Sequence, residues 1–294
     1  MADFKIPHKK FKKIGGIKVS YLDEGKGEMI FCLPPWPSPS LVFVPLIAQI
    51  GKQFRIISPD MPGWLGESQK PVCNPDLKFY TQLIEDFIKS FGINKISLLG
   101  YSYGGVIAQQ LVYRDKSAVK RLVLVSSPFG LENIYQKFKL PLDFFEKIGQ
   151  NILPEKITVK LAYYLKFASM LKEKSRTKGD QFKSLIAEFD KESNQVDARS
   201  ILLCFSVKEP MPVNLEKIRK IPVLLICGGE DDDFVNKDIL LLGQKLGKSP
   251  VILEGADHTH LFFDAEKSAP KIADFFAPPS LWQRLYRFIL DKHN

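Results

Sequence analysis

Cysteine and histidine are both scarce in this chain. Their scarcity limits the disulfide, metal-binding and acid–base chemistry that the chain can carry out. The 294 residues include four cysteines, and no two of them are spaced as Cys-x-x-Cys. This argues against a disulfide framework and against a Cys-x-x-Cys metal or redox motif. Cys32 and Cys227 lie in apolar segments, which predicts packed thiols in a reducing compartment. The four histidines leave few candidates for acid–base work.

Long apolar runs are missing as well. No stretch of eighteen consecutive apolar residues occurs, which argues against a transmembrane helix. The lysine-rich start, Met1–Lys13, lacks the apolar stretch and the small-residue cleavage site of a secretion signal. Together with the setting of the thiols, these features predict a cytoplasmic protein.

Motifs for nucleic acids and dinucleotides are also lacking. The formal net charge is +9, but the lysines are spread along the chain with acidic residues between most of them, which predicts a solvated surface. No basic stripe with interleaved aromatics and no nucleic-acid module occurs. No Gly-x-Gly-x-x-Gly follows an early strand, which argues against a dinucleotide site. Weak attraction to an anionic membrane surface or to acidic ligands stays open as the less favoured alternative.

Strand and helix patterns alternate along most of the chain. Short apolar segments predict strands at residues 17–22, 29–33, 54–58, 95–99, 121–125, 222–227 and 250–253. Helical patterns between them cover residues 41–50, 77–91 and 105–113. This alternation predicts an α/β fold with a mostly parallel central sheet and helices on both faces. A chain with 45% hydrophobic residues at this length suits one such domain with an insertion.

A segment of different composition interrupts the alternation of strand and helix patterns. Residues 131–204 are rich in Lys, Phe and Leu and follow a helical period without continuous buried strands. They are predicted to form a helical cap inserted between the two parts of the core, residues 1–130 and 205–278. The aromatic residues of the cap either line an apolar pocket or pack the cap onto the core.

The carboxyl-terminal stretch, residues 279–294, follows a pair of prolines and predicts an amphipathic helix. One side of that helix would carry an apolar stripe of Leu281, Trp282, Leu285, Phe288 and Ile289. Docking onto the parent domain is the favoured interpretation, and contact with a membrane surface is the alternative. The sequence does not indicate an oligomeric state.

Ser102 lies between two glycines where an apolar strand gives way to a helix. The segment from Gly100 to Gly104 has the form Gly-x-Ser-x-Gly, which in that setting predicts a nucleophile elbow. Such a turn strains the backbone and projects the serine hydroxyl beyond the sheet edge. Small residues at both glycine positions let strand and helix pass closely. The alternative is a glycine-rich turn with an incidental serine.

A serine hydroxyl needs a base within hydrogen-bond reach, and that base needs a third group to orient it. His8 and His293 lie near the chain ends and are poor candidates for the base. His258 and His260 follow the last predicted strand, at the sheet edge where Ser102 should emerge. The residues alone leave the choice between these two histidines open.

Acidic residues follow the predicted strand 222–227, whereas the strand ending at Val125 is followed by Ser126-Ser127-Pro128. The segment 228–235 contains Glu230 and three consecutive aspartates, so several acids could orient the base. A calcium loop is disfavoured, because consecutive aspartates point in different directions and no Asp-x-Asp-x-Asp-Gly pattern follows. The expected order along the chain is therefore serine, acid, histidine.

Four motifs in this order resemble the α/β-hydrolase fold superfamily, in its serine-nucleophile branch with a helical cap. The first is the elbow at Ser102, and the second is Asp60–Ser68, which is similar to the family's Asp-x-x-Gly-x-Gly-x-Ser loop. Gly229–Asp232 matches a Gly-x-x-Asp segment, and Gly255–His258 matches a Gly-x-x-His segment. The resemblance covers nearly all of residues 17–276 except the cap.

This resemblance implies a triad of Ser102, Asp232 and His258. It also implies an oxyanion hole made of two backbone amides, those of Tyr103 and Trp36. Pro34-Pro35 stands where the family usually has His-Gly, and proline has no amide hydrogen to donate. Maspardin-like members of the family share the Leu-Pro-Pro loop, and some of them act as binding proteins.

The resemblance implies a serine hydrolase, carboxylesterase-like or lipase-like, that cleaves a small to medium apolar carboxylic ester through an acyl-enzyme. No cofactor or metal is implied. A serine at the elbow argues against epoxide hydrolases and haloalkane dehalogenases, which have an aspartate nucleophile there. Thioesters, lactones, amides and carbon–carbon bonds beside a ketone suit the same triad. The alternative from a different class is a weakly active or non-catalytic member that binds a ligand or a protein, which the Pro34-Pro35 loop favours.

Overall fold

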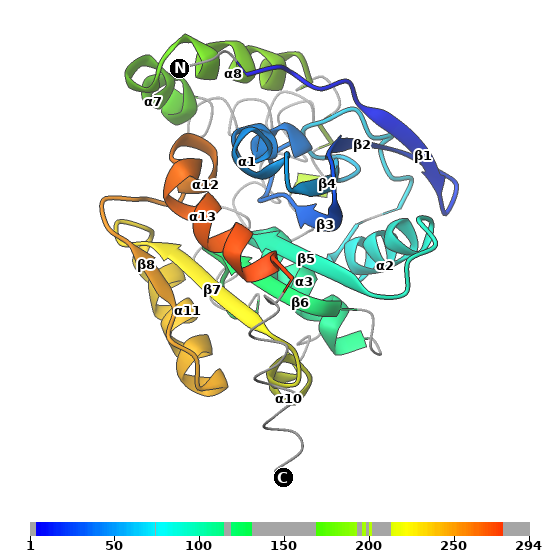
Figure 1. The fold of residues 1–294 in the computed structure, drawn as a ribbon. Coiled ribbons are helices and arrows are strands. Elements are labelled where there is room, and N and C mark those ends of the chain that lie inside the picture. The colour runs from blue at the N-terminus through cyan, green and yellow to red at the C-terminus, as the bar shows by residue number, and fades with distance from the viewer. Residues whose placement is uncertain are drawn as a thin grey trace, which may run out of the picture.

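The computed structural model describes residues 4–73, 75–114, 119–130, 169–192, 196–197, 200–201 and 213–278. Within them, eight strands form one sheet in the order β1-β2-β4-β3-β5-β6-β7-β8 (Figure 1). The strands are β1 (Lys10–Ile14), β2 (Ile17–Gly25), β3 (Glu28–Leu33), β4 (Phe54–Pro59), β5 (Ile96–Tyr101), β6 (Val119–Val125), β7 (Val223–Gly228) and β8 (Val251–Leu253). The β1–β2 and β2–β4 pairs are antiparallel, and every pair from β4 to β8 along the sheet is parallel. The predicted α/β fold with a mostly parallel sheet is confirmed.

Helices cover both faces of this sheet. On one face lie η1 (Ser40–Phe43), α1 (Val44–Ile50), α12 (His260–Phe263) and α13 (Ala265–Phe276). On the other face lie α2 (Leu77–Lys89), α3 (Tyr103–Arg114), α10 (Leu215–Arg219) and α11 (Asp233–Leu246). The central strands are therefore buried on both faces, which explains why their sequences are continuous apolar runs.

Strand β1 was not predicted, because its sequence is mostly exposed lysine. Of its five residues, only Ile14 is buried. It pairs with β2 through a two-residue turn at Gly15 and Gly16, whose φ angles are 53° and 88°. Positive φ at both central residues is what a tight hairpin requires, and glycine adopts it without strain. The two glycines were the sequence signal for this hairpin.

In the described part of the range predicted for the cap, two helices precede α10 and β7 in the chain. They are α7 (Ser169–Lys178) and α8 (Asp180–Glu192), and they contact each other beyond the sheet (Figure 1). The apolar side of α8 packs on α12, where the Phe182 ring lies 5.2 Å from that of Phe263. Residues 131–168, which hold most of the aromatic residues of the predicted cap, and the predicted helix 279–294 lie outside the described residues.

The parallel strands bring distant segments to one edge of the sheet. The chain leaves β3 at Pro34, β5 at Ser102, β6 at Ser126, β7 at Gly229 and β8 at Glu254. Carboxyl ends of parallel strands meet at a common edge, and ligands bind at this edge in open α/β sheets. The loop at Pro34, the elbow at Ser102 and the segments that hold the acids and the histidines therefore come together there.

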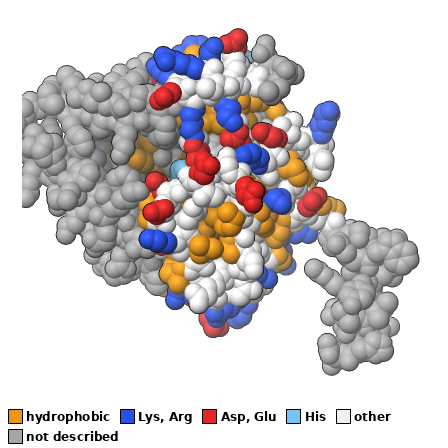
Figure 2. All heavy atoms as spheres, turned by 90° about the vertical axis from the view of Figure 1, so that its left-hand side faces the viewer, with side chains coloured by type: hydrophobic (Ala, Val, Ile, Leu, Met, Phe, Trp, Pro, Cys, Tyr) orange, Lys and Arg blue, Asp and Glu red, His pale blue; other side chains and the backbone are white. Residues whose placement is uncertain are grey.

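Charged side chains of both signs are interspersed on the side of the molecule where β8 and α11 lie (Figure 2). Hydrophobic side chains also gather on this side (Figure 2). The exposed large hydrophobic residues of α11 and β8 are Leu240, Leu241 and Ile252. Among the described helices, none is long and apolar enough to cross a membrane.

A buried ion cluster joins the amino-terminal segment to the end of α8. Lys9 Nζ lies 2.7 Å from Asp60 Oδ2 and also contacts Glu192, and all three side chains are buried. Asp60 accepts further hydrogen bonds from the amide and the hydroxyl of Ser40, from the Ser20 hydroxyl and from the Glu67 amide. Burial, together with the charges of Asp60 and Glu67, raises the pKa of Glu192 to about 8, against the opposing effect of Lys9. Two carboxyl groups thus share one cation.

We expect Glu192 to make stability fall as pH rises through the neutral range. Its pKa is about 8 in the folded protein and near 4.5 when exposed, so the folded state holds the proton more tightly. The contribution of Glu192 is full below about pH 4.5 and is lost as pH rises toward 8. Glu192→Gln should flatten this loss in chemical denaturation measured across the range. Glu188→Gln, which breaks a partly exposed pair on the same helix, is the control. Equal slopes for Glu192→Gln and wild type would contradict the expectation.

Candidate active site

Ser102 is the single residue between strand β5 and helix α3. Strand β5 ends at Tyr101 and α3 begins at Tyr103, and Ser102 has a φ of 52°. This is the left-handed region, which a residue with a side chain occupies only where its surroundings hold it. The Ser102 amide donates to the Val125 carbonyl at 2.8 Å, and the Ser102 carbonyl accepts from Gly105. The sharp turn expected of a nucleophile elbow is thus present.

Glycine at position 104 is required by a close approach. A Cβ atom there would lie 2.2 Å from the Leu33 carbonyl oxygen and 2.7 Å from that of Pro34. The start of α3 is therefore in contact with the end of β3 and the loop that follows it. The two segments predicted to supply oxyanion donors, at Tyr103 and Trp36, lie on either side of this contact.

His258 joins the serine to an acid. Its Nε2 lies 3.0 Å from Ser102 Oγ, and its Nδ1 lies 2.8 Å from Asp231 Oδ1. The carbonyl of His258 accepts a hydrogen bond from the Tyr101 hydroxyl, which ties residues 254–259, the histidine loop, to the end of β5. The imidazole therefore bridges a hydroxyl and a carboxylate, as the nucleophile–base–acid arrangement requires.

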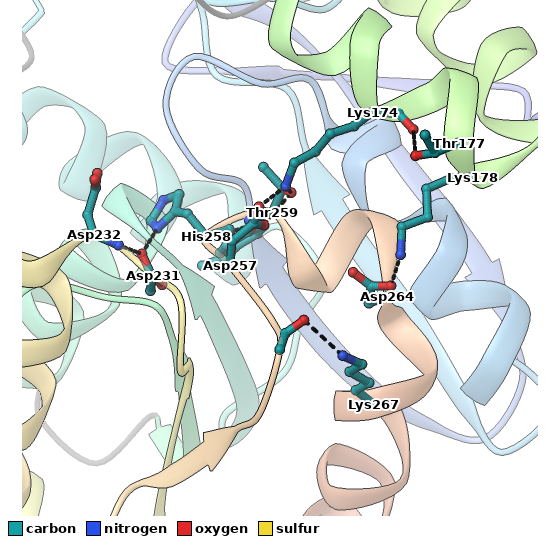
Figure 3. Close-up of polar contacts among 12 residues, drawn as sticks. Lys174, Thr177, Lys178, Asp231, Asp232, Asp257, His258, Thr259, Asp264 and Lys267 are labelled. Carbon is teal, nitrogen blue, oxygen red and sulfur yellow. Dashed lines mark hydrogen bonds and ion pairs between the residues drawn. The ribbon is translucent and has the colours of Figure 1, made fainter.

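The acid beside His258 is Asp231, and the prediction of Asp232 is wrong. The Asp231 side chain is fully buried, whereas Asp232 is exposed and its carboxylate points away from the imidazole (Figure 3). Asp232 instead directs its amide to Asp231 Oδ1 at 2.7 Å. The error arose from a duplicated glycine, because a Gly-x-x-Asp motif counted from Gly228 ends at Asp231. A Cβ at Gly228 would lie 2.1 Å from the Ala256 carbonyl, so Gly228 is the position that needs glycine.

The surroundings of Asp231 keep it ionised. Burial acts to raise the pKa of its carboxyl group, but the hydrogen bond and charge of His258 oppose burial. The Ser126 hydroxyl and the Asp232 amide add to this effect, and the net result is a pKa below the ordinary value. A carboxylate that stays charged at neutral pH can stabilise the imidazolium formed when His258 takes a proton.

The other candidate histidine, His260, does not reach the serine. It is fully buried at the start of α12, and its Nε2 lies 3.4 Å from Ser126 Oγ. Burial is the main cause that lowers the pKa of His260 to about 4. Ser126 was passed over in the sequence because it belongs to no motif, yet the fold places it beside both His260 and Asp231.

Lysines on both sides hold the histidine loop (Figure 3). From α7, Lys174 contacts the Asp257 carboxylate and donates to Thr259 Oγ1 at 3.0 Å. Lys178, one turn further along α7, pairs with Asp264. From α13, Lys267 donates to the carbonyl of Gly255 at 3.0 Å. Helix α7 is therefore attached to the residues that flank His258.

The acidic residues Glu230, Asp232 and Asp233, on either side of the buried Asp231, are exposed to solvent. Residues 230–233 line an open depression of about 490 Å³ together with Phe234 and Lys237. In the described part of the chain, no three His, Cys, Asp or Glu side chains are arranged to hold a metal ion.

Asp231→Asn should slow the reaction of Ser102 with a fluorophosphonate by up to roughly 10⁴-fold, because an amide cannot hold the imidazole in the same tautomer or stabilise its charge. Asp232→Asn removes the same charge one residue away and should leave the rate within about twofold, since its exposed carboxylate contributes less. Circular dichroism checks that both variants fold. A larger loss in Asp232→Asn than in Asp231→Asn would return the role to Asp232.

The contacts of α7 predict a second effect on labelling. Replacing Lys174 and Lys178 together by Met should slow labelling of Ser102 by about fivefold, since partly exposed ion pairs contribute about 1 kcal/mol or less each. High salt should slow the wild type in the same direction. Lys172→Met is the matched control, because Lys172 pairs with Asp190 of α8 and not with the histidine loop. An equal loss in the control would contradict a specific role for the two lysines.

Comparison with known proteins assigns the chain to a family. Residues 29–265 match the sequence profile described as alpha/beta hydrolase fold. The chain is 27% identical over 129 residues to the soluble epoxide hydrolase of Corynebacterium sp. (strain C12), an alignment that covers 44% of this chain and 45% of that protein. The match thus spans less than half the length of that relative. The chain is also 22% identical over 290 residues to the monoacylglycerol lipase abhd6-B of Xenopus laevis, covering 91% of this chain and 82% of that one.

Solved structures share the fold across nearly the whole chain. The epoxide hydrolase CorEH without ligand superposes with a TM-score of 0.72 at 20% identity, covering 92% of this chain and 99% of that one. The esterase EaEST from Exiguobacterium antarcticum superposes with a TM-score of 0.67 at 17% identity, covering 91% and 99%. With the profile match over residues 29–265, these findings show that the chain belongs to the α/β-hydrolase fold family.

Proposed function

We propose that the protein is a serine hydrolase in which Ser102 is the nucleophile, His258 the general base and Asp231 the group that orients the base. The observation that carries this proposal is the unbroken contact from Ser102 Oγ through both imidazole nitrogens to Asp231 Oδ1, at 3.0 and 2.8 Å. A serine at positive φ, held in place by the neighbouring strand, is the second support.

The proposed reaction is acyl transfer in two halves. Ser102 Oγ attacks the carbonyl carbon of the substrate as its proton passes to Nε2 of His258, and Asp231 stabilises the resulting imidazolium. The tetrahedral intermediate collapses, and His258 returns the proton to the leaving alcohol. Water then attacks the acyl-enzyme with His258 again as base, which releases the acid and restores Ser102.

Backbone amides of Tyr103 and Trp36 are proposed to bind the oxyanion. The contact of Gly104 with the end of β3 brings both segments together and supports this assignment. Removing one such donor typically costs about 2.7–4 kcal/mol of transition-state stabilisation. The loop at Pro34 therefore sets how fast the enzyme is, rather than whether the serine is activated.

The substrate class we propose is a small to medium apolar carboxylic ester. Serine at the elbow separates this chain from the aspartate-nucleophile branch of the family, although the relatives named above include an epoxide hydrolase. The names of the lipase and the esterase among the similar proteins support ester chemistry. We also propose that residues 131–204 form a cap over the site, since α7 is attached to the histidine loop.

A binding protein with little turnover is the second candidate function. The Pro34-Pro35 sequence favours it, because proline supplies no amide and no glycine is present to let the loop adopt unusual dihedral angles.

Hydrolysis of p-nitrophenyl esters from acetate to laurate tests the two candidates. Turnover should disappear in Ser102→Ala, and the optimum chain length should report the depth of the acyl site. Ser102→Gly is the second variant, because glycine adopts the φ of 52° without strain and keeps the fold. Turnover that survives in both variants would remove Ser102 as the nucleophile. A folded wild type that neither turns over nor reacts with a fluorophosphonate would contradict the enzyme proposal and favour the binding protein.

A further inference from the structure

Ser126 occupies a strained position next to the candidate nucleophile. In the described part of the chain, Ser102 and Ser126 are the two residues other than glycine with positive φ, at 52° and 45°. Each directly follows a central strand, and each amide donates to a carbonyl of the next strand at 2.8 Å, that of Val125 or Ile226. Glycine would take this conformation at lower cost, so a serine there points to a use for its hydroxyl.

The Ser126 hydroxyl lies between two buried groups of the site. Its Oγ is 3.4 Å from Nε2 of His260, and it faces the carboxyl group of Asp231. Oδ1 of Asp231 is engaged by His258 and by the Asp232 amide. Oδ2 of Asp231 is buried and has no hydrogen-bond partner among the described residues. One oxygen of the carboxylate therefore has no partner among the described residues, and the Ser126 hydroxyl lies close enough to the carboxyl group to lower its pKa.

The protonation of His260 decides the direction of these contacts. His260 is fully buried, and burial lowers its pKa to about 4, so its ring is neutral at physiological pH. A neutral imidazole carries one hydrogen, on one of its two nitrogens. Nδ1 of His260 has no partner in the described part of the chain, whereas Nε2 faces the Ser126 oxygen. A hydrogen on Nε2 has an acceptor within reach, whereas a hydrogen on Nδ1 would have none among the described residues.

We propose that Ser126 and His260 are positioning residues that hold the acid of the triad. Nε2–H of His260 donates to Ser126 Oγ, and the Ser126 hydroxyl donates to Oδ2 of Asp231. Both oxygens of the carboxylate are then held, so that Oδ1 stays aligned with His258 as the imidazole gains its charge. This inference rests on the proposed function, because it assigns Asp231 to the triad.

The alternative is a polar pair that merely fills the core, and two substitutions at one position separate the two roles. Ser126→Ala removes the hydroxyl and keeps the strain, whereas Ser126→Gly removes the hydroxyl and relieves the strain. A positioning role predicts that both variants lose about tenfold or more in kcat on the best p-nitrophenyl ester, because hydrogen bonds to charged groups are the stronger ones. KM should be unchanged, since Ser126 is fully buried.

Ser127→Ala is the matched control. Ser127 is the adjacent buried serine, but its hydroxyl contacts Gln109 and the Pro128 carbonyl and does not face the triad. We expect its kcat to stay near that of the wild type. Wild-type kcat in Ser126→Gly, or an equal loss in Ser127→Ala, would overturn the proposal.

Substitutions of His260 test the other half of the chain of hydrogen bonds. The amide nitrogen of glutamine reaches the place of Nε2, so His260→Gln should retain most of the kcat, whereas His260→Phe keeps a ring without a donor and should lose it. Equal kcat for these two variants would remove His260 from the proposal.

Proton NMR distinguishes failure of this inference from failure of the proposed function. The resonance of the hydrogen on Nδ1 of His258 reports its bond to Asp231, and it can be followed in a protein with no turnover. If the wild type does not react with a fluorophosphonate, the proposed function fails, and the resonance still tests the network. It should shift in Ser126→Gly and stay unchanged in Ser127→Ala. An unshifted resonance in Ser126→Gly would show that Ser126 does not hold Asp231.

Discussion

The left-handed backbone at Ser102 is the constraint on which the rest of the site depends. A strand must end and a helix must begin within one residue, which requires the two to pass very closely. A Cβ atom at Gly100 would lie 2.4 Å from the Cα of Gly105, so no larger residue fits there. The hydrogen bond from the Ser102 amide to Val125 then fixes the turn against the next strand. Position and direction of the hydroxyl follow from these contacts, and the other groups are placed around it.

The order of the strands explains how three distant segments meet at that hydroxyl. The nucleophile follows β5, the acid follows β7 and the base follows β8, while β6 lies between the first two. Adjacent strands are about 4.8 Å apart, so the residue after β6 leaves the sheet between the nucleophile and the acid. A small polar residue is suited to that place, and Ser126 is the residue found there. The same geometry gives the site its acid and a hydroxyl to support that acid.

Ion pairs connect the loops of the site to the helices around it. The loops that carry the base and the acid concentrate carboxylates in a chain whose formal net charge is +9. Two lysines of α7 pair with Asp257 and Asp264, on either side of α12. Lys9 lies between the carboxylates of Asp60 and Glu192 at the far end of α8. Lysines that were interpreted from the sequence as a solvated surface therefore include several with specific structural partners. Helices α7 and α8 are fastened to the core by these pairs and by the aromatic packing of α8.

By itself, the sequence determined the alternation of strands and helices, the elbow at Ser102 and the segments that hold the acid and the base, because these depend on neighbours along the chain. It could not decide which aspartate faces the histidine, since two adjacent glycines allow two registers of the same motif. The fold selects Asp231 through the bond from the Glu230 amide to the Ala256 carbonyl. Strand β1 was missed because its lysines carry no apolar pattern. The contact of Ser126 with His260 joins residues 134 positions apart. The direction of a side chain at the end of a strand is set by such long-range contacts, and only the tertiary structure decides it.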